Sequence, residues 1–314
     1  MSDIIVSFVV PTYNRINYLK KTINSILMQS NKNFELIVAE NNCNDETLEW
    51  LKDQYNIKVV HHDKKVDMFT NWNSGIREAI GKYVIVLSDD DIASDNMVSE
   101  ISKLDKKYNN IGMIMFNHTI LNEKDSEQGK YISKYEGFYD KGEAFKLFSL
   151  GVNNRVCGIA FNREQIENLG CFDEKFDWTA ADSKLIQQMA IISSVYFVEE
   201  KINLPSYRIW SNSLTNEKFL SNEWHKQIKI WVDDIYEFSK EKIGYNFSDE
   251  RNRIMMDNYL AAIQANLNID NMESIQKFIK EMPKINETLK FSILKFILSK
   301  KSFFKLYIKM KKEI

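Results

Sequence analysis

The sequence contains little proline, glycine or cysteine: three, ten and three residues, respectively, in 314. So few prolines and glycines exclude a collagen-like chain and argue against a long flexible linker. The three thiols are odd in number and far apart, which excludes a disulfide framework and the usual spacing of a zinc site. They indicate reduced cysteines in a reducing compartment, at positions Cys43, Cys157 and Cys171.

The sequence has no long apolar run and no strong net charge, and it does not predict a targeting segment. No basic stretch followed by an apolar core opens the sequence, so we expect no signal peptide. No run approaches about 18 apolar residues, so we expect no membrane-spanning helix. The net charge of −2 gives no general reason to expect nucleic acid as a partner. We therefore expect a cytoplasmic protein, with one large domain or one domain plus an appendage.

Strand and helix patterns alternate over the first 116 residues. Such alternation predicts an α/β fold with a mainly parallel sheet and helices on both faces. Pro11 is expected to stop the first strand, Asn44 or Asp45 to cap the second helix and Gly81 to end the third. The predicted strands are 4–10, 34–39, 57–60, 84–87 and 111–116, and the predicted helices are 15–29, 45–55, 68–80 and 95–108.

Polar clusters follow three of these strands, at 12–15, 40–42 and 88–91. Ligands bind beyond the carboxyl ends of the strands in such sheets, so the clusters predict a common site. The last cluster contains Asp89, Asp90 and Asp91, directly after a buried apolar run. Consecutive carboxylates repel each other, and a divalent cation such as Mg²⁺ or Mn²⁺ relieves that repulsion. A solvated acidic turn is the alternative reading.

The other two clusters have side chains suited to a nucleotide. Tyr13 can stack on a base, and Asn14 and Arg15 begin a helix whose amide groups favour phosphate. Asn41 can hydrogen-bond the polar edge of a base. No Gly-x-Gly-x-x-Gly motif follows the first strand and no Gly-Lys-Ser/Thr loop is present. These absences argue against a dinucleotide site and against a phosphate-loop ATPase.

Together, these segments resemble the nucleotide-sugar half of the inverting family 2 glycosyltransferases, which have the GT-A fold. Residues 9–15 (VVPTYNR) are similar to the opening strand and turn of that family, and 36–45 (LIVAENNCND) to its second strand and helix start. Residues 73–83 are similar to the helix before its Asp-x-Asp metal motif, and 87–91 (LSDDD) stand where that motif lies.

The resemblance implies a nucleotide-diphosphate sugar as donor and Mn²⁺ or Mg²⁺ as cofactor. Asp90 would be the direct metal ligand, supported by Asp89 and Asp91. Ser88 replaces the first Asp of the motif, and Asn41 lacks the charge of the usual acidic pair, which leaves uridine, thymidine and guanosine donors open. The implied nucleotide-binding residues are Pro11, Thr12, Tyr13, Asn14, Arg15, Glu40, Asn41, Asn73, Ser88, Asp89 and Arg208.

The second half of the transferase domain, 117–217, would carry the catalytic base. The family has a Glu-Asp pair at a helix start, and here the pair is Ala181-Asp182. The resemblance implies that Asp182 removes the proton of the acceptor hydroxyl. A helix cap is the alternative role of Asp182, and Asp173 and Asp177 are the alternative bases.

A further segment of this half, 207–215, resembles the segment that folds over the donor phosphates in this family. Arg208 would stabilise the leaving diphosphate there. Trp210 stands where the family often has histidine, which puts a histidine–metal or histidine–phosphate contact in doubt. Trp210 and Trp178 can form a platform for a sugar ring, or they can simply pack in the core.

The remaining region, 218–314, reads as helices at 221–242, 249–266, 272–281 and 287–312. The last of them combines lysines with aromatic residues, a composition that suits an anionic membrane surface. Packing against neighbouring helices or a second subunit is the alternative. We therefore predict a glycosyltransferase that acts on a glycan or a lipid-linked glycan in an inverting and metal-assisted reaction. An inactive nucleotide-sugar-binding or scaffolding protein is the competing hypothesis, and a nucleotidyltransferase is a third.

Overall fold

The structure is a computed structural model that describes residues 4–151, 153–199, 203–210, 218–219, 221–267, 271–284 and 289–300. The chain divides into two compact units. The first, here called the α/β unit, comprises Met1–Phe148, Val152–Asp177 and Ala181–Trp210. The second, the helical unit, comprises Ser149–Gly151, Trp178–Ala180 and Ser211–Ile314.

An eight-stranded sheet with the order β3-β2-β1-β4-β9-β5-β10-β8 organises the α/β unit. Strands β9 and β8 are antiparallel to their neighbours, and the other pairs are parallel. This arrangement confirms the predicted mainly parallel sheet. The strands are β1 (Val6–Thr12), β2 (Phe34–Glu40), β3 (Lys58–His61), β4 (Tyr83–Val86), β5 (Met113–Met115), β8 (Gly137–Tyr139), β9 (Ile159–Asn162) and β10 (Val195–Phe197).

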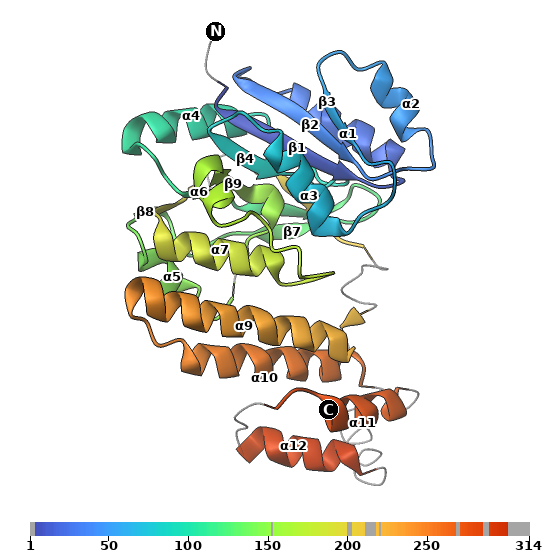
Figure 1. Cartoon of the computed structure of the whole chain (residues 1–314), viewed down its shortest axis with the longest axis vertical. Helices are drawn as coiled ribbons and strands as arrows, with labels where there is room; N and C mark the ends of the chain where they lie inside the picture. The colour runs from blue at the N-terminus through green and yellow to red at the C-terminus, as the bar shows by residue number, and fades with distance from the viewer. Residues whose placement is uncertain are drawn as a thin grey trace. The chain divides into compact units, whose positions relative to one another are not determined.

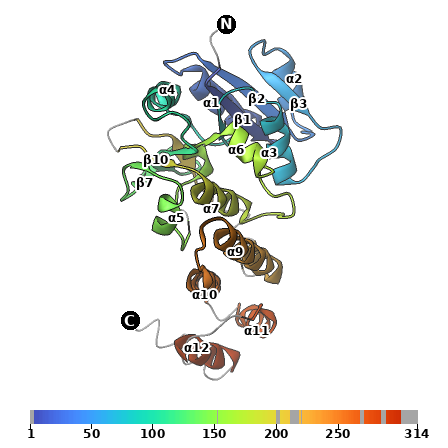
Figure 2. The ribbon, with the colours of Figure 1, turned by 60° about the vertical axis from the view of Figure 1, so that its left-hand side comes forward.

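Helices cover both faces of this sheet (Figures 1 and 2). Side chains alternate along a strand, so Val6 and Phe8 of β1 pack with residues of α1 and α4, while Val9 faces α3. Gly75 of α3 lies so close that an added Cβ would be 2.4 Å from Cγ1 of Val9. The helices are α1 (Ile16–Leu27), α2 (Thr47–Lys52), α3 (Met68–Arg77), α4 (Met97–Tyr108), α5 (Glu143–Leu147), α6 (Arg163–Asn168) and α7 (Ala181–Ile192).

Strand β1 continues through Pro11 to Thr12, so our prediction that Pro11 stops the strand is wrong. The carbonyl of Val9 accepts from the N–H of Leu87, so the backbone polar groups of Val9 point toward β4. These groups alternate in direction along a strand, so the backbone of Pro11 also points toward β4. Strand β4 has already ended on that side, at Val86. The missing N–H of Pro11 therefore costs no hydrogen bond of the sheet.

Gly81 does not end the third helix, because α3 finishes at Arg77 with Glu78 as its C-cap. Instead, the N–H of Gly81 donates to Oγ of Ser7 at 2.8 Å. A Cβ at Gly81 would lie 2.7 Å from the backbone nitrogen of Ser7. The glycine is therefore required for close approach to β1, which the local sequence alone does not indicate.

A second sheet, with the order β11-β6-β7, was missed by the sequence analysis. Its strands are β6 (His118–Leu121), β7 (Glu127–Tyr131) and β11 (Ser206–Arg208). Strand β7 is polar and carries Gly129 in its middle, so it lacks the alternating apolar pattern of a half-buried strand. Ile92 bridges Ser206, which joins this sheet to the segment after the three consecutive carboxylates.

The helical unit contains α9 (Asn222–Ile243), α10 (Ser248–Ala265), α11 (Met272–Glu281) and α12 (Leu289–Ser299). Ser221 caps α9 by accepting from the N–H of Trp224, and Gly244 ends this helix in the left-handed region. These helices confirm the predicted helical region, although 287–288 and 301–312 of the expected last helix lie outside the described residues. No helix among those described has both the length and the apolar character needed to span a bilayer.

Candidate active site

The turns after β1 and β2 lie side by side, because Thr12 pairs with Glu40 in the register of the two strands. The N–H of Asn41 donates to the carbonyl of Thr12 at 3.1 Å. Asn14 and Asn42 both have a φ of 55°, a conformation that asparagine tolerates better than most residues. The sequence thus folds two tight polar turns against each other at the carboxyl edge of the sheet.

The three consecutive aspartates after β4 join this edge and are 6 %, 7 % and 2 % exposed. Oδ2 of Asp89 accepts from the hydroxyl of Thr12 at 2.7 Å, and Oδ1 of Asp91 accepts from the N–H of Arg208 at 2.9 Å. Burial, reinforced by the charge of Asp90, raises the pKa of Asp89 to about 7. Burial also raises the pKa of Asp91 well above its ordinary value. A bound cation would favour the charged form of both groups.

Asp90 is the carboxylate that the cationic and aromatic side chains approach. Its Oδ2 accepts from Nη1 of Arg15 at 2.5 Å and from Nε1 of Trp210 at 2.6 Å. The guanidinium of Arg15 also lies over the Trp210 ring, 4.9 Å from its centroid. The structure therefore brings Arg15, Asp90 and Trp210 together.

Arg208 is fully buried and uses its guanidinium within the protein. Nε donates to the carbonyl of Asp90 at 2.8 Å, and Nη1 to the carbonyl of Asn122 at 2.8 Å. Nη2 pairs with Asp125 at 2.7 Å. Arg208 thus fastens the aspartate loop to the β6–β7 turn, and its predicted contact with a leaving diphosphate stays a prediction.

The aspartates fit a divalent cation that is shared with a bound phosphate. Asp89 and Asp91 already accept hydrogen bonds inside the fold, while Asp90 faces an exposed cation, Arg15. Mg²⁺ is commonly held by one or two carboxylates together with phosphate oxygens. Within the described residues, no group of three or more His, Cys, Asp or Glu side chains is arranged to hold a metal ion by itself.

The predicted base-binding residues have partners of their own. Asn41 accepts from the N–H of Val66 at 2.8 Å and donates to the carbonyl of Val66 at 3.0 Å, so both ends of its amide are used. Glu40 is fully buried and contacts Nδ1 of His61. Tyr13 remains 38 % exposed, with Nζ of Lys65 4.0 Å from its ring centroid.

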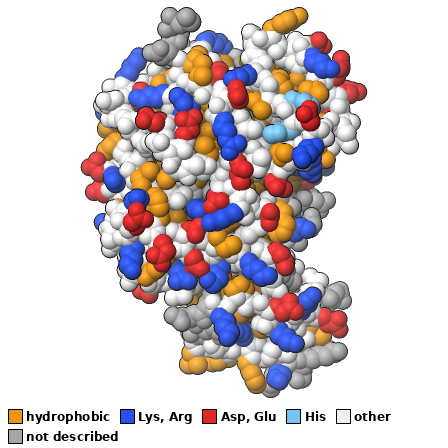
Figure 3. Space-filling view, in the orientation of Figure 1, with side chains coloured by type: hydrophobic (Ala, Val, Ile, Leu, Met, Phe, Trp, Pro, Cys, Tyr) orange, Lys and Arg blue, Asp and Glu red, His pale blue; other side chains and the backbone are white. Residues whose placement is uncertain are grey.

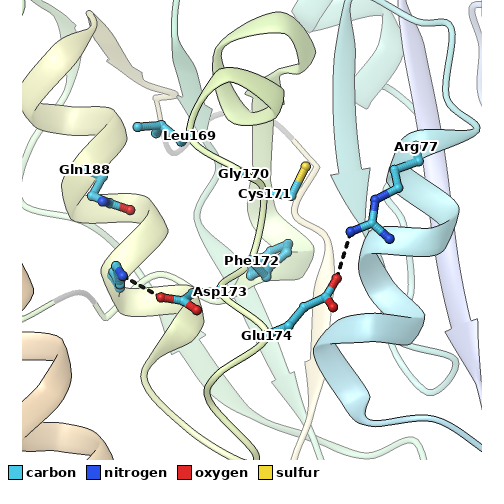
Figure 4. A pocket seen from close by; sticks show the side chains of 9 residues that line it. Arg77, Leu169, Gly170, Cys171, Phe172, Asp173, Glu174 and Gln188 are labelled. Carbon is cyan, nitrogen blue, oxygen red and sulfur yellow. Dashed lines mark hydrogen bonds and ion pairs between the residues drawn. The ribbon is translucent and has the colours of Figure 1, made fainter.

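Asn73 lies elsewhere, on α3, where its amide holds the backbone N–H and carbonyl of Phe172 at 3.0 and 2.7 Å. Beside it is a cavity of about 330 Å³ between α3, α7 and the loop that follows α6. Figure 4 shows that the charged groups of this cavity pair with each other, Arg77 with Glu174 and Asp173 with the α7 lysine. None of the residues that line this cavity belongs to the aspartate loop, and the amide of Asn73 is used at Phe172, so a nucleotide contact of Asn73 stays a prediction.

Asp182 lies in the first turn of α7, where its Oδ1 accepts from the N–H of Ser183 at 2.7 Å. Burial of the carboxyl group raises the pKa of Asp182, which makes it a stronger base. Burial acts in the same direction on Asp173, but hydrogen bonds from Lys184 and Lys175 hold its pKa below the ordinary value. Of these two carboxylates, Asp182 is the better suited to take a proton.

Two residues that the sequence did not indicate, Thr22 and Arg155, act on the aspartate loop and on Asp182, respectively. The hydroxyl of Thr22 on α1 donates to the carbonyls of Asp89 and Asp91 at 2.9 and 2.8 Å. Thr22 interrupts the apolar face of its helix, which is a signal that a polar partner lies opposite. The positive charge of Arg155 acts on Asp182, and its guanidinium lies 5.0 Å from the centroid of Tyr207.

The two tryptophans of the predicted sugar platform belong to different units. Trp210 belongs to the α/β unit, and Trp178 to the helical unit. The N–H of Trp178 donates to Oε1 of Gln227 at 3.4 Å, and Lys218 lies over its ring at 5.8 Å. The indole of Trp210 instead takes part in the aspartate cluster, so its nitrogen has a polar role that the sequence did not indicate.

Residues 7–170 match the family model described as Glycosyl transferase family 2. An uncharacterized glycosyltransferase of Rickettsia felis is 31 % identical over 153 residues, 46 % of this chain but 24 % of the relative. The glucosyltransferase WfgD of Escherichia coli, named for UDP-Glc and an alpha-D-GlcNAc-diphosphoundecaprenol acceptor, is 28 % identical over 152 residues, 45 % of this chain and 56 % of WfgD. The chain thus spans about a quarter to about half the length of these relatives.

Solved structures share the fold at low identity. S. aureus TarS 1-349 in complex with UDP-GlcNAc has a TM-score of 0.63 and 13 % identity, over 89 % of this chain and 82 % of that structure. The Pyrobaculum calidifontis mannosyltransferase PcManGT, in complex with GDP-Man and Mn²⁺, has a TM-score of 0.54 and 13 % identity, over 98 % of this chain and 84 % of that structure. These likenesses confirm the predicted GT-A-like architecture.

Proposed function

Because the chain belongs to glycosyl transferase family 2, we propose that it transfers a sugar from a nucleotide-diphosphate sugar to a hydroxyl group of an acceptor, with inversion. The observation that carries this proposal is the convergence of the β1 turn, the β2 turn and the buried aspartates at one edge of the sheet. A donor of the UDP-sugar type is favoured by the ligand of TarS and by the name of WfgD.

The donor's diphosphate would lie at the aspartate loop. Asp90, supported by Asp91, would hold Mn²⁺ or Mg²⁺, which when bound supplies positive charge to offset the charge on the leaving diphosphate. Tyr13 offers an exposed ring for the base, and Arg15 offers a guanidinium for the phosphates. The Mn²⁺ in PcManGT supports the choice of metal.

Asp182 would act as the general base in a single displacement. It would take the proton of the acceptor hydroxyl while the new carbon–oxygen bond forms on the face of the sugar opposite the breaking bond to diphosphate. Its raised pKa suits this role. The acceptor is proposed to be a glycan or a lipid-linked glycan, for which the name of WfgD gives the precedent.

The test is a thermal-shift screen of UDP, GDP and UDP-sugars, each with and without Mn²⁺. We expect UDP with Mn²⁺ to raise the melting temperature most, because a ligand at a hundred times its dissociation constant adds about 2.7 kcal/mol to the free energy of unfolding. Slow release of UDP from a stabilising UDP-sugar would then support the enzyme over an inactive binding protein. Absence of stabilisation by every nucleotide would contradict the proposal.

We also propose that α12 contacts an anionic membrane surface. Its apolar side chains Leu289, Ile293 and Phe296 are 77 %, 50 % and 57 % exposed and recur at helical spacing. In Figure 3, hydrophobic side chains and Lys or Arg side chains lie near one another at the lower end of the view, where Figure 1 labels α12. The sequence from 289 onward is strongly basic, with one acidic residue, Glu313, and eight lysines. The lysines are Lys290, Lys295, Lys300, Lys301, Lys305, Lys309, Lys311 and Lys312.

Replacing Ile293 and Phe296 together by asparagine should weaken binding to vesicles that contain anionic lipid by at least about tenfold, because two apolar side chains no longer enter the interface. Vesicle sedimentation at low and high salt measures this effect. Ile80 of the α/β unit is 65 % exposed, so Ile80→Asn is the matched control. Equal sedimentation of the double variant and the control would favour the packing alternative.

A further inference from the structure

Arg15 lies against two of the aspartates at the edge where a divalent cation would be held. Its Nη1 is 2.5 Å from Oδ2 of Asp90 and 3.6 Å from Oδ1 of Asp89. Both carboxylates are almost fully buried, whereas the Arg15 side chain is 43 % exposed. A buried pair of like charges needs a neighbouring cation, and the guanidinium is the cation that the chain itself provides.

Trp210 fixes this arrangement from the other side. Its Nε1 donates to the same oxygen of Asp90 at 2.6 Å, and its ring supports the guanidinium of Arg15 at 4.9 Å. Tyr18 packs edge-on against the same ring, with centroids 5.1 Å apart. Arg15 is therefore held on Asp90 by an ion pair and a ring contact, while its exposed side can still turn toward a ligand.

We propose that Arg15 is a tethered counter-ion that competes with the divalent metal for Asp90 and leaves when a nucleotide diphosphate binds. The diphosphate gives the guanidinium a new partner of matching geometry, so release of Asp90 costs less once the nucleotide is present. Metal and nucleotide then increase each other's affinity by the same factor. The inference rests on the proposed function, and it assigns to Arg15 the coupling between the two ligands.

The test compares Mn²⁺ binding, by electron paramagnetic resonance of free Mn²⁺, in the full chain with and without saturating UDP. Wild type should bind Mn²⁺ weakly alone and tightly with UDP. Arg15→Gln should bind Mn²⁺ alone about tenfold more tightly, because the competing charge is removed, and the gain from UDP should shrink by a similar factor. Arg15→Lys should stay close to wild type, since it keeps the charge.

Arg77→Gln is the matched control, because Arg77 is also an exposed arginine paired with a carboxylate, Glu174, away from the aspartate loop. It should leave Mn²⁺ binding unchanged. If Arg15→Gln does not melt like wild type, Arg15→Met makes the same charge change with an apolar stem. Mn²⁺ binding that is unchanged or weaker in the neutral variants, with UDP-linked binding intact in wild type, would overturn this inference alone. No Mn²⁺ binding in any variant, even with UDP, would overturn both it and the proposed metal.

Discussion

Replacing Asp182 by asparagine should slow sugar transfer at least about a hundredfold and leave the affinity for UDP and Mn²⁺ unchanged, because a positioned general base contributes about 10²–10⁴-fold. Asparagine keeps the Oδ1 that accepts from the N–H of Ser183, so the start of α7 should be preserved. It cannot take a proton. Steady-state release of UDP in the presence of an acceptor measures the loss in kcat.

The pH dependence of the transfer rate distinguishes the two roles considered for Asp182, general base and helix cap. Burial raises the pKa of Asp182, so the wild-type rate should fall as the pH is lowered toward that raised value and the carboxylate takes up a proton. At saturating Mn²⁺, which favours the charged forms of Asp89 and Asp91, the residual rate of Asp182→Asn should lack this acid limb. Asp173→Asn is the control, since its carboxylate is paired with Lys184. Near-wild-type turnover in Asp182→Asn, with a large loss in Asp173→Asn or Asp177→Asn, would move the base to the preceding turn.

Replacing Asp90 by alanine should abolish the effect of Mn²⁺ on UDP affinity. Asp90 makes the shorter contact with Arg15, 2.5 Å against 3.6 Å for Asp89, while Asp89 and Asp91 accept hydrogen bonds from Thr12 and from the backbone of Arg208. Without Asp90 the metal would lose its direct protein ligand. Calorimetric titration of UDP with Mn²⁺ or with a chelator measures the change.

Asp53→Ala is the control for this variant, because Asp53 is an exposed aspartate at the end of α2. It should bind UDP with the metal dependence of wild type. A melting curve of Asp90→Ala without ligand checks the fold, since Arg15 and Trp210 both lose a partner. If Mn²⁺ still strengthens UDP binding in folded Asp90→Ala, the metal does not depend on this carboxylate.

The parallel strands and the polar clusters at their carboxyl ends could be predicted because each is marked by a short pattern of neighbouring residues. Short apolar runs such as Val84–Leu87 are typical of buried strands, and the polar residues follow at their ends. The β6–β7 hairpin lacks that signal, since Gly129 and the charged residues around it do not alternate with apolar ones. The role of Gly81 depends on Ser7, which is far away in the chain, so no local pattern contains it.

Side-chain partners were the least predictable part of the site. The sequence placed Asn41 near a base, yet its amide holds Val66, which lies on a separate loop. The residue type of Arg208 predicts a contact with the phosphates, but it does not indicate the pair that Nη2 makes with Asp125. Such pairings depend on which loops the fold brings together, and the residue types alone favour several partners equally.

The bond between Arg208 and the β6–β7 turn also bears on how this protein can vary in evolution. Hairpin turns at the surface usually tolerate insertions and exchanges. Here Asn122 and Asp125 of that turn hold the guanidinium whose other end supports the backbone of Asp90. A homologue that changes the length of this turn should therefore also change Arg208 or provide a new acceptor for it. The turn and the aspartate loop are then expected to vary together across the family, although they are more than thirty residues apart in the chain.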